Sequence, residues 1–169
     1  TNEQKSFINK IKKNKNFNDD TKILSTMSSF SDLKVLVIGE TIIDEYVYCE
    51  ALGKSGKEPH LVLRDIYEEL YLGGVVAIGR NISNFCKKVG ILTMIGDDKK
   101  YKNLIKKNLN KNINIKYLYK SKSPTIIKKR YIDLVSKSKI LGVYSLNDEI
   151  LNKKDEQTFR KMVEKEIIK

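Results

Sequence analysis

KVLVIGETIIDEY, residues 34–46, is the stretch that decides the fold. It opens with an unbroken apolar run, Val35 to Ile38, which is typical of a strand buried on both faces of a parallel sheet. The run ends at Gly39, and a polar segment that carries Asp44 follows it. Ligands of open α/β sheets bind just beyond the carboxyl ends of strands, so we expect Asp44 to lie where a ligand binds.

A second segment, LGGVVAIGRNISNFCKKVG at residues 72–90, belongs with the first. Its glycine pair, Gly73 and Gly74, precedes an apolar helix predicted over 74–88. Glycine lets the backbone approach a ligand closely, and a helix N-terminus offers free N–H donors. Helical spacing predicts that one apolar face of this helix packs inward, formed by Ala77, Ile78, Ile82 and Phe85.

The rest of the chain alternates between strand and helix patterns, which predicts an α/β fold. We expect a partial parallel sheet with flanking helices, in which 34–39 and 89–95 are adjacent parallel strands. A small antiparallel β-lid, with strands near 46–67 and 113–135, is expected to stand off this sheet. The strands are predicted over 34–39, 45–52, 60–67, 89–95, 113–118, 125–135 and 139–144. Further helices are predicted over 99–109 and 151–169. In the last helix we expect Phe159, Met162, Val163 and Ile167 to face inward.

The order of five elements resembles the N-terminal half of a ribokinase-type (PfkB) carbohydrate kinase. These elements are Gly39, Asp44, Gly73-Gly74, Gly90 and Ile95-Gly96-Asp97. The segments GETIIDEYVY, Glu58-Pro59, LGG and SPTIIKKRYI more closely resemble the kinase domain of the bacterial heptose-7-phosphate kinase/ADP-heptose synthase group. The resemblance covers residues 34–149. It implies a ribokinase-like fold, a sugar or sugar-phosphate substrate, and ATP and Mg as cofactors of the parent protein, with neither expected on this chain.

The resemblance also bears on domain organisation. Residues 1–31 are polar and lysine-rich, and we interpret them as a linker or helical extension from an upstream domain, with short helices around Phe7, Ile8 and Ile11 and over 21–28. A nucleotidyltransferase is the fused neighbour that the resembled group implies. Residues 32–169 are then the N-terminal half of a ribokinase-like domain. A lid leaves one apolar face open, so we expect a homodimer through it.

Candidate substrate-binding residues follow from the same segments. Asp44 can accept hydrogen bonds from two vicinal hydroxyls, and Gly73 and Gly74 can donate backbone N–H groups. Lys128 and Arg130 lie two apart on a predicted strand, so they share a face and can hold a substrate phosphate.

Each of these residues also has a structural interpretation. Asp44 can be a turn or cap residue, the glycine pair can serve helix–sheet packing, and the basic pair can be a solvated strand face. For Asp97, which follows Gly96, we expect a structural task, capping the next helix.

The sequence departs from the resembled family at three places. An asparagine usually follows the glycine pair by four residues, but Ile78 stands there and cannot bond a hydroxyl. Glu40 stands where an aspartate is commoner. The G-A/T-G-D motif that carries the catalytic base and anion-binding turn is absent from these 169 residues, so we name no catalytic residue and expect no phosphate transfer by this chain alone.

Two hypotheses therefore stay open. In the first, the chain is the sugar-binding half of an ATP-dependent carbohydrate kinase, inactive as this fragment. In the second, it is a degenerate non-catalytic ribokinase-like fold used for dimerisation or ligand binding, which Ile78 favours.

Composition limits the binding partners and cofactors that we expect for this chain. A net charge of +12 raises nucleic acid as a partner, but the lysines are scattered, without an Arg-rich arm or aromatic-interleaved basic strand, so we expect no specific nucleic-acid binding. Anionic sugar phosphates suit this charge better. One histidine and two isolated cysteines, Cys49 and Cys86, predict no metal site and a reduced, cytoplasmic protein. No apolar run is long enough to span a bilayer.

Overall fold

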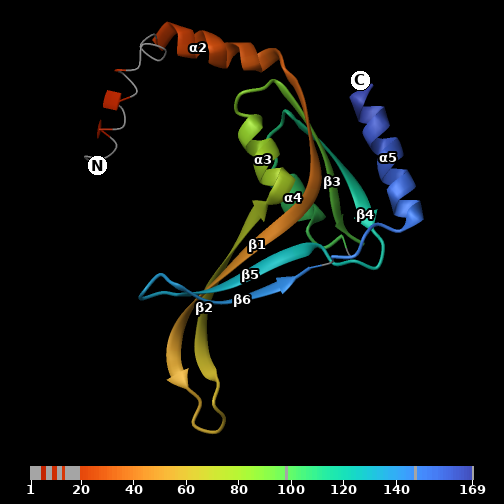
Figure 1. Ribbon diagram of the computed structural model, residues 1–169. Coiled ribbons are helices and arrows are strands. Elements are labelled where there is room, and N and C mark those ends of the chain that lie inside the picture. The colour runs from red at the N-terminus through yellow and green to blue at the C-terminus, as the bar shows by residue number, and fades with distance from the viewer. Residues whose placement is uncertain are drawn as a thin grey trace.

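The computed structural model describes residues 5–6, 9–10, 13, 20–97, 99–146 and 148–168 (Figure 1). The helix predicted around Phe7, Ile8 and Ile11 lies outside these residues. The helix predicted over 21–28 is present as α2, Asp20–Ser29, and a single 3-10 turn, η1 at Phe30–Asp32, leads from it into the first strand. No helix among the described residues is long and apolar enough to cross a membrane.

Strand β1, Lys34–Lys54, belongs to both the main parallel sheet and the β-lid. Its first part pairs in parallel with β3, Lys88–Gly96, from Lys34 opposite Lys88 to Glu40 opposite Met94. Its second part pairs antiparallel with β2, Leu61–Gly73, on one edge. On the other edge it pairs in parallel with β5, Ile126–Asp133. The prediction that 34–39 and 89–95 are neighbouring parallel strands is confirmed.

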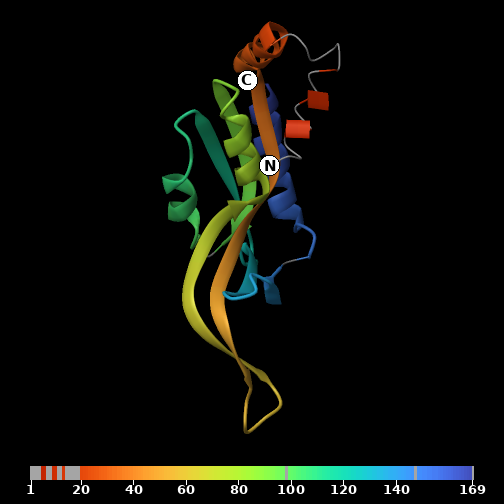
Figure 2. The same cartoon turned by 90° about the vertical axis from the view of Figure 1, so that its left-hand side faces the viewer.

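The main sheet is completed by β4, Ile113–Lys120, which pairs in parallel with β3. Figure 2 shows α3, Gly74–Ile82, and α4, Lys102–Lys107, on one side of this sheet and α5, Lys153–Ile167, on the other. One buried cluster lies beneath α3 and α4 and is formed by Ile43, Leu72, Val76, Ile95, Tyr101 and Ile105, and a second is formed by Val75, Cys86, Val89 and Ile91. The predicted class, a partial parallel sheet with flanking helices, is confirmed.

The lid consists of the second part of β1 with β2, β5 and β6, Lys139–Ser145. The β1–β2 and β5–β6 pairs are antiparallel, as expected, but β1 and β5 are parallel. Of the range 113–135 assigned to the lid, only β5 belongs there, because β4 pairs with β3 in the main sheet. Figure 1 shows the β1–β2 ribbon extending well past β5 and β6.

The predicted break in β1 between Gly39 and the second strand is wrong. Side chains at positions 41, 43, 45, 47 and 49 are buried and those between them are partly exposed, which is the two-residue period of one continuous strand. Asp44 therefore lies within a strand, not in a polar loop. Burial of 35–38 on both faces is also wrong, because Ile38 is 41% exposed and residues 35–37 are only partly buried.

Helix α3 is shorter than predicted and turns a different face inward. Its buried residues are Val75, Val76 and Gly79, whereas Ile78 and Phe85 are about half exposed. The helix ends at Ile82, and a side chain from outside the helix satisfies carbonyl groups of the segment that follows. The side-chain amide of Asn112 donates to the carbonyl oxygens of Ser83 and Cys86 at 2.8 and 2.9 Å.

The end of β3 lies tightly against the loop that precedes β5. A Cβ atom on Gly96 would overlap the backbone of this loop, with Ser123 O only 2.6 Å away. Asp97 does not cap a helix as predicted, since its carboxylate accepts a hydrogen bond from the backbone N–H of Lys122 at 2.9 Å. Gly96 and Asp97 therefore fix the loop between β4 and β5.

Helix α5 is anchored at its N-terminus by buried Asp155. The Asp155 carboxylate accepts hydrogen bonds from the backbone N–H of Ser121 at 2.9 Å and from the Asn152 amide at 2.8 Å. The bond from the Ser121 backbone is the main reason that the pKa of Asp155 lies below its usual value. At the other end Ile167, predicted to face inward, is exposed, and Glu166 instead forms an ion pair with Lys116.

We predict that Gly96→Ala destabilises the protein by about 1–3 kcal/mol, because the new methyl group meets backbone atoms that cannot rotate away. Gly56→Ala is the control, since a Cβ atom there meets nothing within 4 Å. Urea unfolding followed by circular dichroism measures both. Equal midpoints for the two variants would contradict the close approach of β3 to this loop.

We predict that Asp155→Asn lowers the thermal midpoint at pH 7 by roughly 3–6 °C, since it removes a charged acceptor. A carboxylate whose pKa is lowered by folding stabilises the protein above its unfolded pKa of about 3.9 and loses that effect as the pH falls through the folded pKa. The difference between the variant and the unsubstituted protein should therefore shrink in melts at about pH 2.5. The exposed neighbour Glu156 gives the control, Glu156→Gln. A difference independent of pH would show that the charge of Asp155 is not what anchors α5.

Candidate functional site

Asp44 lies on β1 where the strand passes from the main sheet into the lid. Because side chains of a strand alternate between faces, Asp44 shares a face with Glu40, Tyr46 and Tyr48, and the opposite face is buried. The carboxylate is thus presented from a rigid strand beside the carboxyl ends of the parallel strands, where α/β sheets bind ligands.

Arg130 on β5 forms an ion pair with Asp44. Arg130 Nη1 donates to Asp44 Oδ1 at 2.6 Å, and the two side chains are only 16% and 23% exposed. The guanidinium carbon lies 5.4 Å from the ring centre of Tyr46 and 5.7 Å from that of Tyr144. The hydrogen bond to Asp44 is the largest cause of the raised pKa of Arg130. This arginine therefore stays charged, and it lies close to two aromatic rings.

The glycine pair lies directly against Asp44. A Cβ atom on Gly73 would overlap Asp44 Oδ2, and one on Gly74 would overlap the carbonyl oxygen of Glu40. Gly74 also has φ of +58°, a conformation that side chains disfavour. Glycine at both positions lets the start of α3 touch β1, so close packing alone accounts for the pair. In this arrangement Asp44 Oδ1 accepts the hydrogen bond from Arg130, and Asp44 Oδ2 lies against Gly73.

Lys128 shares the face of Arg130, as predicted, since both cations lie against the ring of Tyr144. Its ammonium group is 6.0 Å from the ring centre. Lys128 pairs with Asp44 along the backbone of β1 and β5. Among the described residues, however, no carboxylate forms an ion pair with Lys128. The structure thus brings Asp44, Gly73 and Arg130 into contact and leaves Lys128 beside them.

Tyrosines line the surface next to Asp44, a feature that we did not single out from the sequence. Asp44, Tyr46, Tyr48 and Tyr71 border a shallow hollow of about 270 Å³. The rings of Tyr46 and Tyr71 meet edge to face with centres 5.6 Å apart. The Tyr71 hydroxyl donates to Glu69 at 2.7 Å, and this bond raises the pKa of Tyr71. The signal in the sequence was the two-residue spacing of Asp44, Tyr46 and Tyr48.

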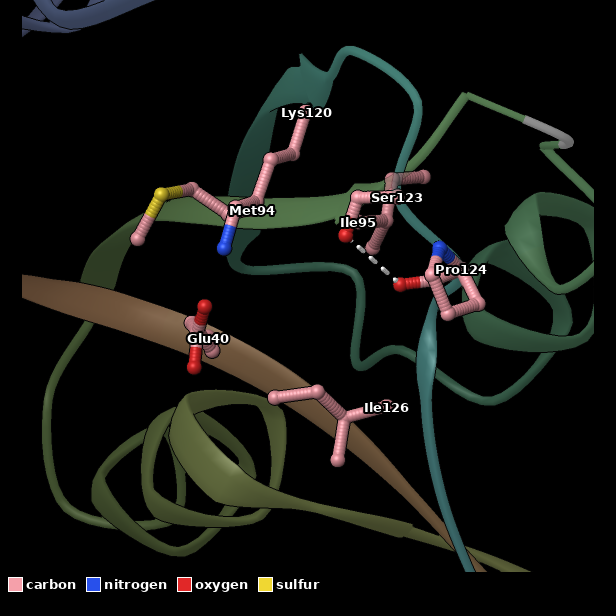
Figure 3. Close-up of a pocket in the computed structure, with 7 residues that line it drawn as sticks. All are labelled: Glu40, Met94, Ile95, Lys120, Ser123, Pro124 and Ile126. Carbon is pink, nitrogen blue, oxygen red and sulfur yellow. Dashed lines mark hydrogen bonds between the residues drawn. The ribbon is translucent and has the colours of Figure 1, made fainter. Parts of the chain in front are cut away.

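A second cavity lies at the carboxyl ends of β3 and β4, beside Glu40 of β1 (Figure 3). Figure 3 shows the side chains of Glu40 and Lys120 pointing into the same space, with Met94 beside them. Lys120 donates to the carbonyl oxygen of Glu149 at 2.7 Å. The volume, about 10 Å³, holds no more than one water molecule. The cavity is therefore too small for a sugar.

The described residues include no group of three or more His, Cys, Asp or Glu side chains that could hold a metal ion. These residues therefore form no all-protein cage for the magnesium that the family resemblance implies.

No protein-family profile matches the chain. The bifunctional protein HldE of Campylobacter jejuni subsp. doylei is 26% identical over 135 residues, which is 80% of this chain and 26% of that protein. The chain thus spans about a quarter of the length of this curated relative.

Solved structures of low sequence identity share the fold. The possible 1-phosphofructokinase of Thermotoga maritima superposes with a TM-score of 0.55 at 14% identity, over 77% of this chain and 40% of that one. Phosphofructokinase-2 of Escherichia coli, in complex with fructose-6-phosphate, superposes with a TM-score of 0.52 at 13% identity, over 80% of this chain and 42% of that one. The suspected resemblance is confirmed: the chain has a ribokinase-like fold and is similar in sequence to bifunctional HldE proteins.

Proposed function

We propose that this chain is the sugar-binding part of an ATP-dependent carbohydrate kinase whose acceptor is a sugar or sugar phosphate of the heptose type. The observation that carries the proposal is the contact of Asp44 with Gly73 and Arg130 at the junction of main sheet and lid. ATP and magnesium would be bound by the longer protein. A fused nucleotidyltransferase and a cytoplasmic location belong to the same proposal.

The arrangement suits a polyhydroxylated ligand. Asp44 Oδ2, turned toward Gly73, can accept a hydrogen bond from an acceptor hydroxyl. The rings of Tyr46 and Tyr71 border the same hollow and offer apolar surface to the C–H face of a sugar. Charge and aromatic surface together favour a ligand with hydroxyls on one side and carbon on the other.

A non-catalytic role is the second candidate, and Ile78 is the observation that favours it. This residue stands where the resembled family carries a sugar-binding asparagine, and it is about half exposed. Such a protein would still bind a ligand or a second copy through the lid. Sugar-dependent formation of ADP by the longer protein discriminates between the two candidates.

We further propose a homodimer through the lid. The described lid exposes large apolar side chains on both of its hairpins: Leu52, Leu61 and Ile66 on the β1–β2 ribbon, and Leu141 and Val143 on β6. Light scattering should give twice the monomer mass. Leu52→Lys combined with Ile66→Lys should shift the protein toward monomer, and a monomer already in the unsubstituted protein at high concentration would contradict the proposal.

We predict that Asp44→Asn in the longer protein lowers sugar-dependent turnover about tenfold to a hundredfold. A charged acceptor is lost, and each factor of ten corresponds to about 1.4 kcal/mol. We also expect this substitution to lower the free energy of unfolding by about 1–2 kcal/mol, because the largely buried Arg130 then lacks its carboxylate partner. Steady-state kinetics and a thermal melt measure the two effects.

The control for this substitution is Glu50→Gln. Glu50 also lies on β1 and also pairs with an arginine, Arg64, but the pair is exposed and lies outside the hollow. Its kinetics should match the unsubstituted protein. Equal turnover in Asp44→Asn and Glu50→Gln would show that Asp44 has a structural role and does not bind the substrate.

A further inference from the structure

Lys128 and Arg130 were predicted to hold a substrate phosphate together, but the structure gives them different surroundings. Arg130 has three partners: Asp44 Oδ1 at 2.6 Å and the rings of Tyr46 and Tyr144. The same Nη1 also lies 3.4 Å from the carbonyl oxygen of Lys128. The charge of Arg130 is already paired with Asp44, and a phosphate would have to compete with that carboxylate for it, so Arg130 is less suited to receive one than a cation without a carboxylate partner.

Lys128 is engaged only weakly by comparison. Its ammonium lies 6.0 Å from the ring centre of Tyr144, and among the described residues no carboxylate pairs with it. A flexible stem carries this charge, so it can turn toward an anionic group without breaking an ion pair.

We propose that Arg130 is a positioning residue for Asp44, while Lys128 is the cation that receives an anionic group on the acceptor. Arg130 holds Oδ1, and this fixes Oδ2 at the Gly73 turn, where it meets the acceptor hydroxyl. The inference rests on the proposed function and assigns the roles within its site.

The shape of arginine fits this task. The planar guanidinium lies near two rings while it donates a hydrogen bond to Asp44, and an ammonium does not reproduce both contacts. Without Arg130 the Asp44 carboxylate can rotate about its side-chain bonds, and the hydroxyl it holds loses its orientation. Misorientation of a reacting group lowers turnover even where binding persists.

The test is steady-state kinetics of the full-length protein with a seven-carbon sugar and with the phosphate ester of the same sugar. Arg130→Met should lower kcat/KM about tenfold to a hundredfold for both acceptors, mainly through kcat, and Arg130→Lys should restore only part of the loss. Lys128→Met should raise KM for the phosphate ester more than for the free sugar. Arg64→Met removes another arginine–carboxylate pair of the lid, that with Glu50, and serves as the matched control.

Four results would overturn the inference. If Arg130→Met matches Arg64→Met, Arg130 does not position Asp44. If Arg130→Met impairs only the phosphate ester, Arg130 is itself the phosphate ligand, and full activity of Arg130→Lys would show that any cation suffices. Absence of turnover with either acceptor in the unsubstituted protein would overturn the proposed function, and this inference with it.

Discussion

The close approach of the Gly73-Gly74 turn to β1 is the constraint on which the rest of the structure depends. Side chains at either position would overlap Asp44 or the backbone of Glu40, so β2 could not end, and α3 could not begin, against the strand. This contact ties the ribbon of the lid to the helix that covers the main sheet. It also brings Asp44 beside the start of α3, so one packing requirement shapes both fold and site.

The continuity of β1 has a similar double consequence. One strand supplies the pairing edge for β3 and then for β2 and β5, so main sheet and lid share a backbone and not merely a linker. Groups placed along its partly exposed face, Glu40, Asp44 and Tyr46, hold fixed spacings of about 3.3 Å per residue. A site built on such a strand is more rigid than one built on a loop.

The sequence predicted the parallel pairing of β1 and β3, because an apolar run followed by a glycine turn and an amphipathic helix has few alternatives. It missed the continuity of β1, since Gly39 and the polar residues after it looked like a strand end. It also misassigned the inner face of α3, where Val75, Val76 and Gly79 pack inward and Ile78 does not. Asp44 and Arg130 were both selected, but their partnership spans 86 residues and depends on the register of β1 with β5, which no local pattern specifies.

The most direct test of the central claim is a crystal structure of the longer protein with a bound acceptor sugar, in which the distance from Asp44 Oδ2 to the nearest sugar oxygen is measured. The account predicts a hydrogen bond of about 2.5–3.0 Å, with Oδ1 still on Arg130 and the sugar ring against Tyr46 or Tyr71. A sugar bound without contact to Asp44, or one that displaces Arg130 from it, would contradict the account.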